Sequence, residues 1–142
     1  MKKTIVLILT LALPFIFLGC DSASENASTD SSSKSSSNSA SYEQISASAA
    51  YSIMQSESDY IIIDARTQEE FDQGHIENAI LLPEYEVAQK AESLLPDKDQ
   101  LILVYCRSGR RSKIAADELV KLGYTNVKEF GGIIDWTYET VK

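Results

Sequence analysis

The sequence is poor in the residues that build metal centres and in basic side chains. It has two cysteines, Cys20 and Cys106, and one histidine, His75. These are too few soft ligands for a metal centre, so we expect no metal and no cofactor. Lysine and arginine together number 13 against 21 acidic residues, which gives a net charge of -8. A chain this acidic is a poor partner for nucleic acid, and we expect no nucleic-acid binding.

No apolar run is long enough to span a bilayer comfortably. The longest covers 15 residues, 4–18, and follows Lys2 and Lys3, whereas a spanning helix needs roughly 20 residues. A charged start followed by an apolar segment is typical of a secretory signal. The run ends at Phe-Leu-Gly-Cys, residues 17–20. This end resembles the lipobox of bacterial lipoprotein signal peptides, although the family usually has a smaller aliphatic residue where Phe17 stands.

The lipobox resemblance implies a signal peptide over residues 1–19 and a lipid carrying palmitate on Cys20. Residues 20–41 then form a tether, since 11 of the 21 residues after Cys20 are serine and none is large and apolar, so ordering the segment would bury little apolar surface. We expect the protein on the extracytoplasmic face of a bacterial membrane, held there by its lipid. An uncleaved anchor and a chance cysteine after an ordinary signal are the alternatives.

The remaining residues, 42–142, alternate between short apolar runs and helical patterns. Strands are predicted at 60–63, 79–82, 101–105 and 126–130. Helices are predicted at 47–54 after an N-cap at Ser46, after a capping box from Thr67 to Glu70, at 85–95, at 112–122 and in a terminal segment carrying Trp136. Strands separated by helices indicate crossover connections. We therefore predict a single α/β domain with a mainly parallel open sheet flanked by helices.

Cys106 directly follows the strongest predicted strand, at the edge where open parallel sheets bind ligands. Gly109 lets the following loop turn its N–H groups inward, which makes an anion nest at a helix N-terminus. These N–H groups and three nearby arginines favour a thiolate: Arg107, Arg110 and Arg111. The alternative is a buried structural cysteine beside solvated arginines. With Cys20 lipidated, Cys106 has no partner for an intramolecular disulfide.

Three motifs, in order and at suitable spacing, resemble the single-domain rhodaneses, the thiosulfate sulfurtransferase family. The likeness covers nearly all of residues 42–142. The first motif runs from Asp64 to Ile80, the second is the active loop from Cys106 to Ser112, and the third joins Gly131-Gly-Ile133 to Asp135-Trp136.

The resemblance implies a double-displacement reaction in which Cys106 takes the outer sulfur of thiosulfate or polysulfide. It becomes a persulfide and passes the sulfur to cyanide or a thiol. The resemblance also implies a cradle for the persulfide and the donor, in which the three arginines are not ranked: Arg107, Ser108, Gly109, Arg110, Arg111 and Ser112. Asp64 and Arg66 are expected to support the loop or to form a structural salt bridge. We expect the domain to act as a monomer.

The length of the loop argues against phosphatase chemistry. Related phosphatases use Cys-x-x-x-x-x-Arg to surround a tetrahedral oxyanion, but here Arg111 is five residues after Cys106 and Ser112 is six after it. Two other functions remain alternatives: a non-catalytic binding module displayed on the membrane, and a redox cycle on Cys106 that needs an external thiol.

Five residues outside the loop have structural interpretations. His75 and Trp136 are predicted to be packing residues, and a solvated helix face is predicted at Glu84, Glu86 and Glu92.

Overall fold

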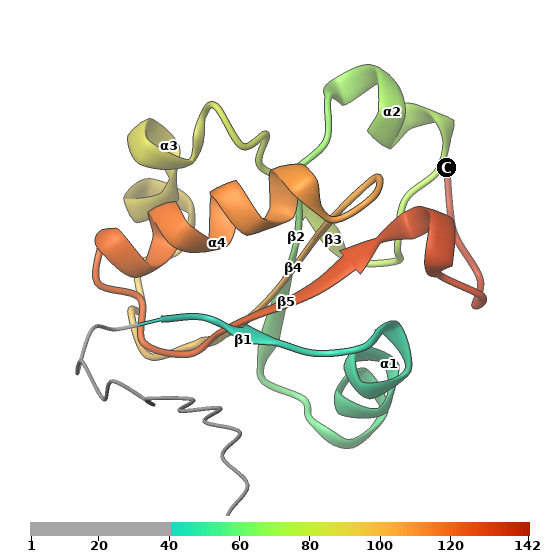
Figure 1. Cartoon of the computed structure of the whole chain (residues 1–142), viewed down its shortest axis with the longest axis horizontal. Coiled ribbons are helices and arrows are strands. Elements are labelled where there is room, and N and C mark those ends of the chain that lie inside the picture. The colour runs from blue at the N-terminus through green and yellow to red at the C-terminus, as the bar shows by residue number, and fades with distance from the viewer. Residues whose placement is uncertain (1–40) are drawn as a thin grey trace, which may run out of the picture. The chain divides into compact units, whose positions relative to one another are not determined.

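The computed structural model describes residues 41–142, which form a five-stranded parallel sheet with helices on both faces (Figure 1). The predicted signal peptide, lipidated Cys20 and nearly all of the tether lie outside the described residues. The strand order is β1-β5-β4-β2-β3, and every pair is parallel. The predicted fold class is confirmed.

In chain order the elements are β1 (Glu43–Gln44), α1 (Ala47–Ser56), β2 (Tyr60–Asp64), α2 (Gln68–Gln73), β3 (Ala79–Leu81), α3 (Val87–Leu94), β4 (Leu101–Cys106), α4 (Arg110–Lys121), β5 (Val127–Gly132) and a 3-10 helix (Ile133–Asp135).

Two apolar clusters pack on the two faces of the sheet. Alternation along β4 sends Ile102, Val104 and Cys106 to the face covered by α3 and α4, and Leu103 and Tyr105 to the face covered by α1. All five of these residues are fully buried or nearly so. A strand buried on both faces is apolar throughout, which is why β4 gave the strongest strand signal.

Local signals placed two helix starts correctly. The Ser46 hydroxyl accepts a hydrogen bond from the N–H of Ala49 at the start of α1. At α2, the Thr67 side chain accepts from the N–H of Glu70, and the Glu70 carboxylate accepts from the N–H of Thr67. This is the predicted capping box, and it fixes where Glu70 points.

The predicted start of α4 was two residues late, and this changes the active loop. Gly109 has a φ of 94° and serves as the N-cap of a helix that begins at Arg110. Only residues 107–109 therefore separate the end of β4 from α4. A left-handed residue reverses the chain in less space than an ordinary turn, and glycine adopts it without the steric cost of a side chain. The result places Ser112 within the first helical turn.

The predicted terminal helix carrying Trp136 was wrong. A 3-10 helix of three residues, 133–135, takes its place, and Trp136 follows it. Tertiary packing decides this segment: the Trp136 ring contacts Tyr51 and Tyr138 with centroids 6.0 Å and 4.9 Å away, and Val141 pairs with His75 as an antiparallel bridge. Trp136 is buried, as predicted. The two-residue strand β1 was missed because it is too short to carry a pattern.

No helix within residues 41–142 has the length and apolar character needed to cross a membrane.

Candidate active site

Cys106 is the last residue of β4 and lies at the carboxyl edge of the sheet. It pairs with Gly132 at the end of β5, and its side chain is buried, with 1% exposed. The N–H of Gly109 donates to the Cys106 Sγ over 3.1 Å. Because α4 begins at the next residue, its unpaired N–H groups lie at the same end of the helix. The predicted nest therefore forms, with a three-residue loop.

Hydrogen bonds outweigh burial at the Cys106 sulfur. Burial alone raises the pKa of the thiol, but the hydroxyl and N–H of Ser112 and the N–H groups of Ser108 and Gly109 stabilise the thiolate. The net result is a Cys106 pKa below its ordinary value of 9.0. The arrangement thus favours the form of the thiol that attacks electrophiles.

A buried carboxylate, Glu129 of β5, fixes the first turn of α4. Its Oε1 accepts from the Ser112 hydroxyl over 2.6 Å and from the Gly131 N–H over 2.9 Å. Glu129 is 3% exposed and Ser112 is fully buried. Sequence reasoning missed Glu129. The sequence did hold a signal for it: Glu129 is two residues after Val127, so both side chains lie on the α4 face of β5.

Gly132 lets the active loop approach β5 closely. A Cβ built on Gly132 would lie 2.3 Å from the Arg107 carbonyl oxygen and 2.6 Å from the Cα of Ser108. Any side chain there meets backbone atoms of the loop, which cannot swing away. Gly132 of the third motif thus has a steric role at the loop.

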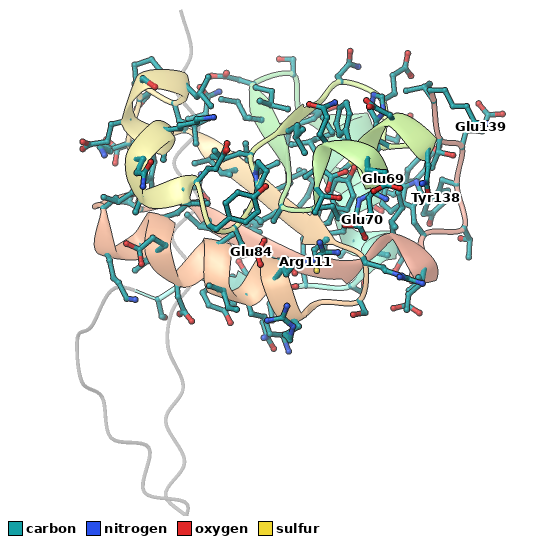
Figure 2. The ribbon with its side chains drawn as sticks, turned by 90° about the horizontal axis from the view of Figure 1, so that it is seen from above. Glu69, Glu70, Glu84, Arg111, Tyr138 and Glu139 are labelled. Carbon is teal, nitrogen blue, oxygen red and sulfur yellow. The ribbon has the colours of Figure 1, made fainter. Side chains whose placement is uncertain are left out.

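The three arginines of the loop have different environments. Arg107 and Arg110 are exposed and make no ion pair with any of residues 41–142. Arg111 is instead held by Glu70 of α2, with Nη1 2.6 Å from Oε2 and Nη2 2.8 Å from Oε1. Figure 2 shows these two side chains meeting across the site. The sequence did not rank the three arginines, and the structure distinguishes them: Arg111 is paired, whereas Arg107 and Arg110 make no ion pair within residues 41–142.

Glu84 also departs from the prediction. It precedes α3 and is half-buried, and its Oε2 is a buried side-chain atom without a hydrogen-bond partner in the described part of the chain. The Glu70 hydrogen bonds raise the pKa of Arg111, and the charges of Glu70 and Glu84 add to this effect. Figure 2 shows Glu84 beside Arg111. Of the three glutamates predicted on a solvated face, Glu92 is exposed and Glu86 is half-buried beside Lys90.

Asp64 and Arg66 form a buried salt bridge on the far side of β4 from the sulfur. Arg66 Nη2 lies 2.6 Å from Asp64 Oδ2 and donates to the carbonyl of Gly74, while the Tyr105 hydroxyl donates to the same Asp64 oxygen over 2.6 Å. No hydrogen bond joins Asp64 or Arg66 to residues 107–112 within the described chain. The structural interpretation of this pair fits the geometry.

His75 takes no part in the site. Its ring stacks on Phe71 with centroids 3.7 Å apart, and Nδ1 lies 3.0 Å from the Phe71 carbonyl. The prediction of a hydrogen-bonded packing residue is confirmed. No group of three or more metal-ligating side chains occurs within residues 41–142.

The active loop borders a pocket of about 490 Å³ between α2 and the segment after β5. Its lining includes Arg66, Glu70, Arg107 and Trp136. A larger pocket of about 670 Å³ lies beside α1 and is lined by no residue of the loop. The smaller pocket is therefore the one that adjoins the site.

Comparison with known proteins agrees with this geometry. Residues 46–139 match the family model described as a rhodanese-like domain. The chain is 39% identical over 80 residues to thiosulfate sulfurtransferase PspE of Escherichia coli, covering 56% of this chain and 77% of that protein. It is 38% identical over 79 residues to a sulfurtransferase of Allochromatium vinosum, covering 55% and 72%.

The fold gives the same result. A solved structure described as rhodanese with anions from E. coli superposes with a TM-score of 0.56 at 37% identity, covering 58% of this chain and 98% of that one. The chain therefore belongs to the rhodanese-like domain family.

Proposed function

We propose that the chain is a sulfurtransferase that moves a sulfane sulfur from an anionic donor to a thiophilic acceptor through a persulfide on Cys106. The observation that carries this proposal is the buried Cys106 Sγ, which accepts the Gly109 N–H over 3.1 Å at the start of α4 and has a lowered pKa. Family membership and the sulfurtransferase names of its relatives support it. No cofactor takes part in the proposed chemistry.

In the first half-reaction the Cys106 thiolate attacks the terminal sulfur of thiosulfate or of a polysulfide. A bond forms between Sγ and that sulfur while the donor's own S–S bond breaks, and the bonding electron pair leaves with the inner sulfur. Thiosulfate releases sulfite, and the anionic charge of its terminal sulfur remains on the new persulfide. Backbone N–H groups from Arg107 to Ser112 are placed to receive that charge.

In the second half-reaction a thiolate or cyanide attacks the outer sulfur of the persulfide. The new bond forms to the acceptor as the persulfide S–S bond breaks, and Cys106 leaves as a thiolate. The same hydrogen bonds that lower the Cys106 pKa stabilise this leaving group. The site thus returns to its starting state without an oxidant or a reductant.

Arg107 and Arg110 are the residues we assign to the donor's oxygens. Arg110 and Arg111 stand in the first turn of α4, where a positive charge opposes the helix dipole and no acidic residue is present. That local cost is consistent with an anion as the partner. Asp64 and Arg66 take the supporting role, since they brace the end of β2 against β4.

Intact-mass measurement of sulfur loading tests the proposal. A Cys20→Ser chain leaves Cys106 as the only thiol, and its mass is recorded before thiosulfate or polysulfide, after it, and again after cyanide. We expect a gain of one sulfur atom that cyanide removes, and no gain in a matched chain that also carries Cys106→Ser. If neither donor loads the chain, the non-catalytic binding module becomes the better account.

We further propose that Cys20 carries a lipid that tethers a monomeric domain to the extracytoplasmic face of a bacterial membrane. The support is sequence alone: the charged start, the apolar run of residues 4–18, the lipobox-like end and the serine-rich segment after it. Labelling of expressing cells with radioactive palmitate tests this proposal. We expect the natural sequence to carry label in the membrane fraction. The Cys20→Ser variant should carry none, whereas the Cys106→Ser variant should keep its label.

A further inference from the structure

Arg111 belongs to the active loop, yet its guanidinium is already bound by a carboxylate of the protein. The Arg111 charge acts on Cys106, but both terminal nitrogens bond to the Glu70 carboxylate in a bidentate pair. The two side chains are 16% and 24% exposed. Bidentate binding of this kind is what an arginine offers to the oxygens of an anionic substrate. Glu70 therefore occupies the bidentate face that Arg111 would otherwise offer to an anion.

The position of Glu70 is fixed from a second side. Its Oε2 accepts the N–H of Thr67 over 3.2 Å and the Thr67 hydroxyl over 3.1 Å, as part of the capping box of α2. The Arg111 hydrogen bonds, together with the bonds from Thr67, lower the pKa of Glu70 to about 2 against the opposing effect of burial. The carboxylate is thus charged at any physiological pH, and a donor that displaced it would break several hydrogen bonds at once.

The charge of Glu84 also acts on Arg111, although no ion pair joins the two within residues 41–142. Glu84 approaches Arg111 from the segment after β3, and its buried Oε2 has no hydrogen-bond partner among residues 41–142. Glu70 and Glu84 thus both act on the charge of Arg111, whereas Arg107 and Arg110 make no ion pair within residues 41–142.

We propose that Glu70 selects the sulfur donor, disfavouring doubly charged thiosulfate and leaving the site suited to singly charged organic persulfides. This inference rests on the proposed sulfurtransferase function. Repulsion between a donor and the Glu70 charge grows in proportion to the donor's charge, so a dianion is penalised more than a monoanion. A persulfide also has no sulfonate group that needs Arg111.

The chemistry is the same for both donors. The Cys106 thiolate bonds to the terminal sulfur of the alkyl persulfide, the S–S bond of the donor breaks, and its electron pair leaves with the inner sulfur as an alkyl thiolate. The terminal sulfur keeps its negative charge on the Cys106 persulfide. No proton, oxidant or further reactant is needed, so only the leaving group differs: a thiolate in place of sulfite.

Glu70→Gln tests the inference, with Glu69→Gln as its matched control. Glutamine at position 70 keeps the capping box but removes the negative charge that pairs with Arg111. Glu69 is its exposed neighbour in the first turn of α2, so its variant makes the same charge change without contacting Arg111. In chains that also carry Cys20→Ser, single-turnover loading of Cys106 is followed by mass for thiosulfate and for an alkyl persulfide.

We expect Glu70→Gln to load from thiosulfate about tenfold faster, the worth of one charge-assisted interaction, while persulfide loading changes less than about twofold. Glu69→Gln should leave the ratio of the two rates unaltered. Adding Arg111→Gln should abolish the gain, since the freed guanidinium is its source.

Equal or slower thiosulfate loading in a folded Glu70→Gln chain overturns the inference, because Glu70 would then position Arg111 for the donor. The inference is also overturned if both donors load the chain with unmodified Glu70 and Glu70→Gln does not change the ratio of the two loading rates. That result would leave the proposed function intact. Loading by neither donor in the chain with unmodified Glu70 refutes the proposed function itself.

Discussion

The Ser112 hydroxyl lies 2.6 Å from Glu129 Oε1, and this bond joins the first turn of α4 to β5 directly beneath the active loop. Both residues are buried, and the Gly131 N–H donates to the same carboxylate oxygen. Ser112 also stabilises the Cys106 thiolate through its hydroxyl and its N–H. Ser112 therefore both lowers the pKa of the Cys106 thiol and donates to the carboxylate that holds the loop.

Ser112→Ala is expected to raise the pKa of the Cys106 thiol, because it removes a hydroxyl that favours the thiolate. The measurement is the rate of alkylation by iodoacetamide across pH, in a chain with Cys20→Ser. The natural loop should show a midpoint below 9.0, and the variant a higher one. Ser108→Ala is the matched control, since Ser108 acts through its backbone N–H alone. Equal midpoints in Ser112→Ala and Ser108→Ala would show that the Ser112 hydroxyl does not affect the pKa of Cys106.

Glu129→Gln is expected to lower the pH midpoint of Cys106 alkylation, the opposite of the effect of Ser112→Ala. Glu129 is a buried carboxylate bonded to Ser112 in the active loop, and a buried negative charge there opposes the charge of a thiolate. No lysine, arginine or histidine of residues 41–142 forms an ion pair with Glu129. Glutamine keeps an oxygen that accepts the Ser112 hydroxyl but loses the charge. Alkylation at neutral pH should be faster than in the natural loop. A slower rate would show that Glu129 acts mainly by holding Ser112 in place.

The sequence predicted those parts of the site that depend on near neighbours in the chain. The position of Cys106 after β4, the turn at Gly109 and the Thr67–Glu70 capping box involve residues at most three apart. Each has a local physical cause, so spacing alone was sufficient.

The contacts that sequence reasoning missed join distant segments. Arg111 is 41 residues from Glu70, and Ser112 is 17 from Glu129. Nothing in the spacing of these residues indicates which arginine will meet which carboxylate, because the sheet order brings them together. The same holds for the segment at Trp136, where packing against α1 replaced the predicted helix.

Gly132→Ala is expected to lower sulfur loading at least about tenfold, because its Cβ would lie 2.3 Å from the Arg107 carbonyl and so displace the loop that cradles the sulfur. Gly123→Ala, at a φ of 92° with open space around its Cβ, is the control for strain away from the site. It should cost stability but not loading rate. Unchanged loading by a folded Gly132→Ala chain would show that the loop tolerates the shift.

Asp64→Asn is expected to reduce the free energy of unfolding by about 3 kcal/mol, since it leaves the mostly buried Arg66 without its counter-ion. Urea unfolding followed by Trp136 fluorescence gives the value. Glu86→Gln, which breaks a solvent-exposed pair with Lys90, should change it by about 0.5 kcal/mol or less. Equal small losses in the two variants would mean that the buried pair contributes no more than a surface pair.

The Glu70–Arg111 pair is expected to contribute stability at neutral pH that disappears in acid. The folded protein lowers the pKa of Glu70 from 4.5 to about 2, chiefly through the Arg111 hydrogen bonds, so it binds the proton less tightly than the unfolded chain does. The contribution is then present in full above pH 4.5 and falls as the pH drops toward about 2. Urea midpoints of the natural chain and of Glu70→Gln, measured from neutral pH to about pH 2, separate the contribution of Glu70 from that of other carboxylates, which titrate in both proteins.

The difference between the two midpoints should be largest near neutrality and shrink across the acid range, whereas Glu69→Gln should show no such convergence. A difference that stays constant across that range would mean that the ionised carboxylate contributes nothing beyond the shape of its side chain, and it would remove the fixed negative charge on which donor selection by Glu70 depends.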